Sequence, residues 1–163
     1  MRTHMLLRVT VVTVALSASA AAQGRIDYNA AMNGAKVHYK GGRYPKAAAL
    51  FRLAVNDRPS SADARYWLGL ALAQIGRDSL LAAAGQFDTS FTLDTAYVAR
   101  ARRDLDHVYL TTRSLYVSAQ ARMSEADHEG ALRFIRWAVA LNPNEPDYYM
   151  TLGNIYAALD MTD

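Results

Sequence analysis

Apolar side chains recur along most of this chain at the three- to four-residue spacing of amphipathic helices. In the last stretch, Leu152, Ile155, Tyr156 and Leu159 fall on one helical face together with Tyr149. Alanine, leucine and tyrosine are abundant, while glycine and proline are confined to a few sites, a balance that favours helix over sheet. The pattern predicts an all-α protein with helices over residues 27–40, 44–56, 62–75, 79–93, 112–123, 127–141 and 146–159.

Between these helices lies an insert of about 14 residues, numbers 98–111, that no neighbouring segment matches. No proline or glycine stands between Thr95 and Ala126, so the insert is expected to be helical. Asp94 or Thr95 is suited to cap its start. With no helix-breaking residue between them, the insert and residues 112–123 are compatible with one long unbroken helix.

The predicted helices repeat in pairs with a period of 34 residues. Gly34, Ala35 and Gly42 are followed 34 positions later by Leu68, Gly69 and Gly76, and Ser118 and Ala119 by Leu152 and Gly153. Each second helix carries a small residue and a large one four positions on: Ala47 with Phe51, Ala83 with Phe87, and Ala131 with Ile135. Small residues let two helices approach closely while the large neighbour fills the groove beside them.

At these positions the chain resembles the tetratricopeptide repeat (TPR) family. The segment "YMTLGNIY" fits the pattern of a first helix, and Ala47, Phe51 and Pro59 fit that of a second helix. The sequence departs from the pattern at Gly34, Arg122 and Thr95, in slots for leucine, an aromatic residue and proline. The resemblance covers about residues 28–163, as repeats over 28–61, 62–97 and 112–145 and a partial repeat over 146–163. It implies an all-α, alpha-alpha superhelix, a TPR-like solenoid of antiparallel helix pairs.

In such a family the first helices line a concave groove that binds a protein or peptide partner. The resemblance places the following residues in that groove: Met32, Lys36, Tyr39, Lys40, Tyr66, Leu70, Gln74, Tyr116, Gln120, Met123, Met150 and Asn154. Only Lys36 and Asn154 keep the character of the family's carboxylate clamp. Tyrosines and methionines indicate instead a groove for apolar or aromatic side chains. The alternative is that some of these tyrosines, Tyr66 in particular, pack between helices.

The sequence carries no pattern of a catalytic or metal site. The absence of cysteine excludes disulfides, thiolate metal ligands and a cysteine nucleophile. No histidine has a partner histidine at the spacing of a zinc site, and Asp104, Asp106 and His107 are expected to form surface salt bridges rather than hold a metal. No serine elbow or phosphate-binding glycine loop is present. We therefore expect no enzyme activity, no cofactor and no metal.

The first residues have the composition of a secretory signal peptide. A short positive region bounded by Arg2 and Arg8 is followed by an apolar run over residues 9–18. Ala20 and Ala22 then stand before Gln23 at the spacing of a cleavage site. The run is shorter than the roughly 20 residues that span a bilayer, which disfavours the alternative of a membrane anchor. Cleavage after residue 22 would leave one domain over 23–163, in the periplasm or secreted, without a membrane span.

Cleavage would also remove two arginines and no acidic residue, which lowers the net charge from +3 to +1. A chain so close to neutral, with basic residues clustered only at 100–103, is not expected to bind nucleic acid. These observations favour an exported scaffold or adaptor that binds a protein or peptide. The alternative is a regulatory or substrate-presenting segment of a longer envelope enzyme or outer-membrane protein.

The last predicted helix, residues 146–159, corresponds to the first helix of a fourth repeat without its second helix. One face is expected to pack near Phe134, Trp137 and Ala138, and the other to remain open. The expectation is that the sequence is part of a longer chain, or that the open edge docks on another chain, including by self-association.

Overall fold

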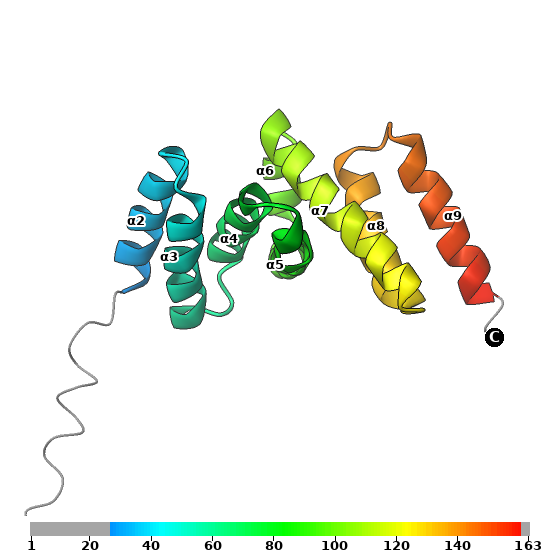
Figure 1. Cartoon of the computed structure of the whole chain (residues 1–163), viewed down its shortest axis with the longest axis horizontal. Coiled ribbons are helices and arrows are strands. Elements are labelled where there is room, and N and C mark those ends of the chain that lie inside the picture. The colour runs from blue at the N-terminus through cyan, green and yellow to red at the C-terminus, as the bar shows by residue number, and fades with distance from the viewer. Residues whose placement is uncertain (1–26, 161–163) are drawn as a thin grey trace, which may run out of the picture.

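The computed structural model describes residues 27–160, and every regular element in that part of the chain is a helix (Figure 1). The predicted signal peptide lies outside the described residues. The elements are α2 (Tyr28–Lys40), α3 (Tyr44–Asp57), α4 (Ala62–Ile75), the 3-10 turn η1 (Arg77–Ser79), α5 (Leu80–Leu93), α6 (Ala96–Ala101), α7 (Leu105–Ser124), α8 (His128–Leu141) and α9 (Pro146–Asp160). The all-α prediction is confirmed.

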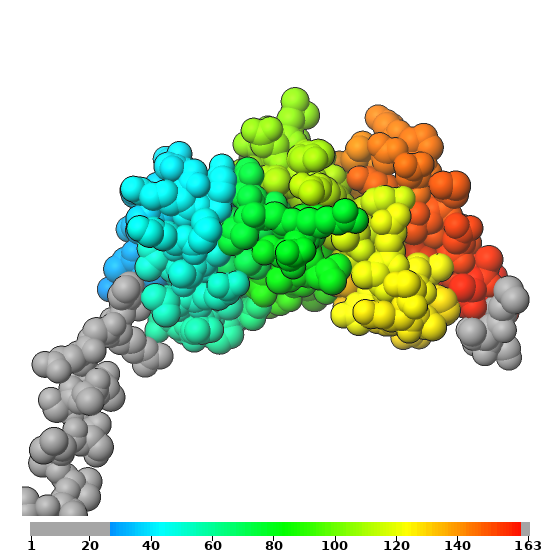
Figure 2. Space-filling model, in the orientation of Figure 1, coloured from blue at the N-terminus to red at the C-terminus, as the bar shows by residue number. Residues whose placement is uncertain are grey.

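Neighbouring helices form pairs that stack into an elongated, arched array (Figures 1 and 2). The pairs are α2 with α3, α4 with α5, and α7 with α8, and the second helix of each pair also packs on the first helix of the next. We call the side formed by α2, α4, α7 and α9 the first-helix face. This stacking of hairpins is the TPR-like arrangement that the 34-residue period predicts.

The small and large residues of the second helices form the centre of each pair. Ala47, Ala83 and Ala131 are fully buried, as are the large residues four positions later, Phe51, Phe87 and Ile135. A Cβ atom at Gly69 of α4 would lie only 2.7 Å from Cε1 of Phe87 in α5. The close approach that the sequence predicted is therefore present, and in the second repeat it requires glycine.

The helices begin and end at chemically related residues in successive repeats. Side chains of Asp27, Ser61 and Asp127 accept hydrogen bonds from backbone N–H groups three residues on and so cap α2, α4 and α8. The turns after α2, α4 and α7 each contain a residue with positive φ: Gly42 (69°), Gly76 (149°) and Ala126 (60°). Ala126 thus adopts, at an energetic cost, a conformation that glycine adopts freely.

The insert does not form one unbroken helix with the third repeat, and that alternative is wrong. The short helix α6 ends at Ala101, and α7 begins at Leu105 after a break. Asp104 causes the new start: its backbone is extended, and its Oδ1 accepts hydrogen bonds from the N–H groups of Asp106 and His107. From Leu105 onward the helix does run continuously into the third repeat. The break lets α6 fold back against α4, α5 and α8.

Candidate functional site

The twelve predicted groove residues do not share one environment. Met32, Tyr66 and Leu70 are buried, with exposed fractions of 4%, 0% and 0%. Their assignment to an open groove is wrong, because they pack inside the array. Lys36, Tyr39, Gln74, Tyr116 and Met123 are half-buried, whereas Lys40, Gln120, Met150 and Asn154 are exposed.

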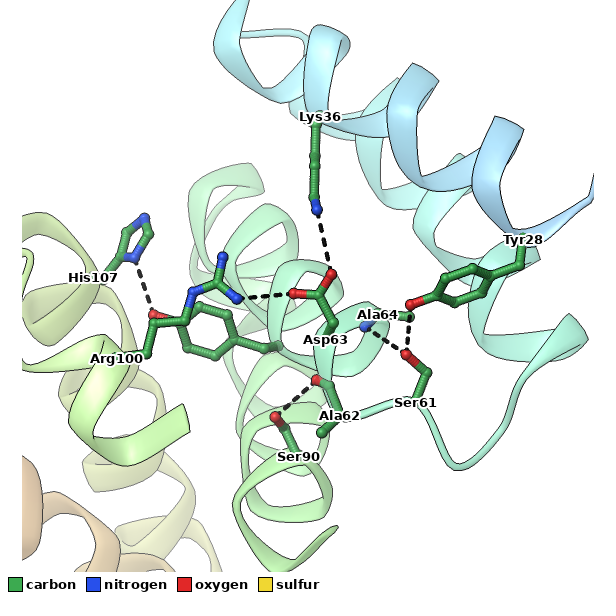
Figure 3. A network of polar contacts seen from close by, with 10 residues as sticks. Tyr28, Lys36, Ser61, Ala62, Asp63, Ala64, Ser90, Arg100 and His107 are labelled. Carbon is green, nitrogen blue, oxygen red and sulfur yellow. Dashed lines mark hydrogen bonds and ion pairs between the residues drawn. The ribbon is translucent and has the colours of Figure 1, made fainter. Parts of the chain in front are cut away.

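Tyr66 is buried because the insert covers it. Its ring lies 5.4 Å from that of Tyr97 in α6 and 5.8 Å from that of His107 in α7, and the guanidinium of Arg100 stands 5.5 Å away. The Tyr66 hydroxyl forms a hydrogen bond of 3.0 Å with Nδ1 of His107 (Figure 3). Burial raises the pKa of Tyr66 well above its usual value. The insert therefore fills the first-helix face over the second repeat.

A polar network fastens α6 to the first two repeats (Figure 3). Asp63 of α4 pairs with Lys36 Nζ of α2 at 3.3 Å and with Arg100 Nη1 of α6 at 3.0 Å. Both cations also lie near the Trp67 ring, at 5.4 and 5.5 Å from its centre. Three helices thus meet at the carboxylate of Asp63, which joins Lys36 of α2 to Arg100 of α6.

Trp67 is the centre of an aromatic cluster that the sequence analysis did not identify. Its ring packs edge-on against Tyr39 at 5.4 Å and stacks on Phe51 at 6.0 Å. Burial raises the pKa of Tyr39 to about 12. The first-helix face of the first two repeats is therefore largely packed. Of the groove residues predicted in these two repeats, Lys40 is the one that is exposed.

The hollow part of the face lies further along, between α7 and the start of α9. A cavity of about 430 Å³ opens there. Its lining includes Leu105, Val108, Tyr109, Thr112, Arg113 and Tyr116 of α7, and Asn142, Glu145, Asp147 and Tyr148 of the α8–α9 turn and α9. We call this cavity the α7–α9 groove. Tyr116 is the predicted groove residue that lines it; Gln120, Met123, Met150 and Asn154 lie on the same two helices outside it.

The α7–α9 groove has an aromatic floor and an apolar, exposed rim. The rings of Tyr116 and Tyr148 lie 5.1 Å apart, and burial raises the pKa of Tyr148. At the rim Leu105 is 85% exposed and Tyr109 61% exposed. Both rim residues come from the insert, so the TPR pattern could not point to them. From the sequence alone they could have been noticed only as large apolar residues in a segment outside the repeats.

Charged side chains at the groove come from α7, from the α8–α9 turn and from α9. Arg113 of α7 stands on one side, and Glu145 and Asp147 stand on the other. A bound segment would therefore meet one cation and two carboxylates around an apolar centre. Such a surface can anchor an apolar or aromatic side chain and select among flanking charges.

Asp104 and His107 lie where the sequence expected a salt bridge, with His107 Nε2 at 3.8 Å from Asp104 Oδ2. Burial lowers the pKa of His107, which outweighs the opposing effect of Asp104. The imidazole is thus neutral at pH 7, and its main role is the hydrogen bond to Tyr66. Across residues 27–160 no three histidine, aspartate or glutamate side chains gather as metal ligands, and no helix is long and apolar enough to cross a membrane.

A family model described as TPR repeat matches residues 35–76, which run from the middle of α2 to the end of α4. No curated protein matches the chain. The match supports the TPR resemblance for the segment from the first repeat to the first helix of the second. TPR units are typically interaction modules without catalytic activity, so the chain has the features of a protein–protein interaction module.

Proposed function

We propose that this protein is an exported scaffold that binds a segment of a partner protein in the α7–α9 groove. The observation that carries the proposal is the pair of exposed apolar side chains at the groove rim, Leu105 and Tyr109. Isolated exposed apolar side chains are common on proteins, but apolar side chains that gather at the edge of one cavity are typical of an interaction site. Over the second repeat the first-helix face is covered by the insert.

The expected ligand is an extended segment or a short helix with one large apolar or aromatic anchor. The anchor would lie over Tyr116 and Tyr148 and be covered by Tyr109, since aromatic contacts supply large area with little ordering cost. Each 100 Å² of apolar surface buried this way contributes about 2.5 kcal/mol before the costs of association. Flanking charges would then face Arg113 and the carboxylates of Glu145 and Asp147.

The proposed location is the periplasm of a bacterial envelope, or the medium. It rests on the order of positive, apolar and small residues before Gln23. In that setting a module without cysteine does not depend on the redox state of its compartment. Its expected partner is another envelope or secreted protein.

Site-specific photo-crosslinking in the native host tests the groove directly. Tyr109 is replaced by a benzophenone amino acid, and the exposed Arg52 of α3 is replaced in the same way as the matched control. We expect a discrete adduct from position 109 that is absent at position 52. Adding Leu105→Ser should reduce that adduct several-fold without changing helical content, because Leu105 is 85% exposed and contributes little to the fold.

An adduct of equal yield from both positions would contradict the proposal, as would an adduct at position 109 that Leu105→Ser leaves unchanged. The first result would show non-specific contact. The second would show that the partner lies near Tyr109 but does not bind through the apolar rim of the groove.

A further inference from the structure

The last helix, α9, leaves one face uncovered. It packs on α8 through the buried side chains of Tyr148 and Ile155. Other large side chains remain in water: Tyr149 is 48% exposed, Met150 63% and Tyr156 41%. Gly153, between them, is exposed as well. We call Tyr149, Gly153 and Tyr156, with the adjoining outer side of α8, the open edge.

Comparison with the earlier repeats shows what the open edge is shaped to receive. Gly153 stands at the same repeat position as Ala35, Gly69 and Ala119, all of which are buried within their helix pairs. A Cβ at Gly69 would meet the ring of Phe87 at 2.7 Å, whereas a Cβ at Gly153 would have no atom within 4 Å. The small residue that permits close helix approach is therefore present on α9, and the approaching helix is not among the described residues.

The outer side of α8 carries the second half of this unfilled interface. In the preceding junction, Asp88 of α5 accepts a hydrogen bond from Trp137 Nε1 at 3.0 Å and forms an ion pair with Arg133 Nε at 3.1 Å, both from α8. The residue of α8 equivalent to Asp88 is Arg136. Its guanidinium donates to the Tyr156 hydroxyl at 3.1 Å, and no ion pair of Arg136 occurs within residues 27–160.

A hollow of about 650 Å³ lies beside Arg136. It is lined mainly by α8 and by Leu159 of α9, with Leu132, Trp137 and Ala140 as apolar walls. An occupant of this space would be in contact with Arg136. Compared with the α5–α8 junction, the charge at this position is reversed from negative to positive. The complementary residue on the occupant is thus a carboxylate.

We propose that the open edge binds an amphipathic helix of a partner protein, seated as the second helix of a fourth repeat. The helix contacts inside the array indicate which residues this partner helix should carry. A small residue faces α9, a bulky apolar residue four positions later covers Gly153, and a carboxylate two positions after the small residue pairs with Arg136. The surface is separate from the α7–α9 groove, so the proposal stands independently of the function proposed above.

A synthetic peptide serves as the probe. It has the sequence of residues 127–143, which forms a second helix in this fold, with Arg133→Glu and Ile135→Phe to supply the carboxylate and the aromatic residue. The control peptide carries Ile135→Phe alone and keeps arginine at the position facing Arg136. Fluorescence anisotropy of labelled peptide against the full chain should show saturable binding of the glutamate peptide and several-fold weaker binding of the control.

Chain variants make the test specific. Gly153→Leu should abolish binding while leaving α9 folded, since space surrounds the position. Gly85→Leu is the matched control, as a Cβ there also meets no atom within 4 Å and Gly85 does not line the hollow beside Arg136. Arg136→Glu should reverse the preference, so that the arginine peptide binds more tightly. Leu105→Ser should leave binding of the glutamate peptide to the open edge unchanged, which separates this site from the α7–α9 groove.

Three results would overturn the proposal. One is the absence of saturable binding, and another is binding that Gly153→Leu and Arg136→Glu leave unchanged. The third is concentration-dependent dimerisation of the chain alone, detected by sedimentation velocity and abolished by Gly153→Leu. That result would show that the occupant of the open edge is a second copy of this chain.

Discussion

The same substitution, glycine to alanine, should have opposite effects at Gly69 and Gly153. At Gly69 the added methyl would lie 2.7 Å from Cε1 and 2.8 Å from Cδ1 of Phe87, far inside the 3.5–4.0 Å of an ordinary carbon contact. Phe87 is fully buried, stacked on Phe91 at 6.2 Å and set edge-on to Tyr66 at 6.0 Å. Its ring therefore cannot move away from the added methyl without disturbing these contacts.

The magnitude follows from two opposing effects. Alanine in a helix interior is better than glycine by about 1 kcal/mol, and overpacking a dense core costs about 1–3 kcal/mol. Gly69→Ala should therefore lower the free energy of unfolding by up to about 2 kcal/mol. Gly153→Ala meets no atom within 4 Å, so only the favourable effect remains, about 0.5–1 kcal/mol.

Urea denaturation followed by circular dichroism measures the first variant, as a lower midpoint at an unchanged slope. Hydrogen exchange of the α9 amides measures the second, as slower exchange, because a terminal helix can fray separately from the array. Equal destabilisation by both substitutions would refute the reasoning, since Gly153 would then be as closely covered as Gly69. A stabilising Gly69→Ala would show that Phe87 has room to move.

Further predictions concern single positions. Ala126→Gly should stabilise the protein by up to about 1 kcal/mol in urea denaturation, because glycine adopts the φ of 60° without strain; a loss would mean that the turn is not left-handed. Ala47→Trp should prevent cooperative unfolding, because the site is fully buried. His107 has a lowered folded pKa, so its stabilising effect is present above about pH 6.5 and lost as the pH falls below it; in His107→Gln that part of the pH dependence of the melting temperature should disappear, and its persistence would assign it to another group. Amino-terminal sequencing of the protein from its native host should begin at or near Gln23, and an intact Met1 in a soluble cytosolic fraction would contradict export.

The repeat pattern predicted the helices well because the information was local. Spacing of apolar residues, capping side chains such as Ser61, and the small and large pair Ala47 and Phe51 all act within one helix or one hairpin. The prediction of an apolar open face on α9 had the same basis, and the exposure of Tyr149 and Tyr156 confirms it.

The groove was predicted less well because its residues depend on contacts distant in sequence. Tyr66 stands at a groove position of the second repeat, yet it is covered by Arg100 and His107, 34 and 41 residues further on. That cover exists because α6 ends at Ala101 and Asp104 caps a new helix, α7, after the break. A single capping residue changed which tyrosines remain open, and no regularity of the repeats could indicate it.

The most direct test of the proposed function is a hydrogen-exchange footprint. The protein that becomes crosslinked at position 109 is purified, and exchange of the full chain is compared with and without it. The proposal predicts slower exchange in residues 105–116 and 142–148, with no change in α3. Protection confined to α3 and α5, or to residues 36–40 of the first repeat, would contradict it and place the binding surface elsewhere on the array.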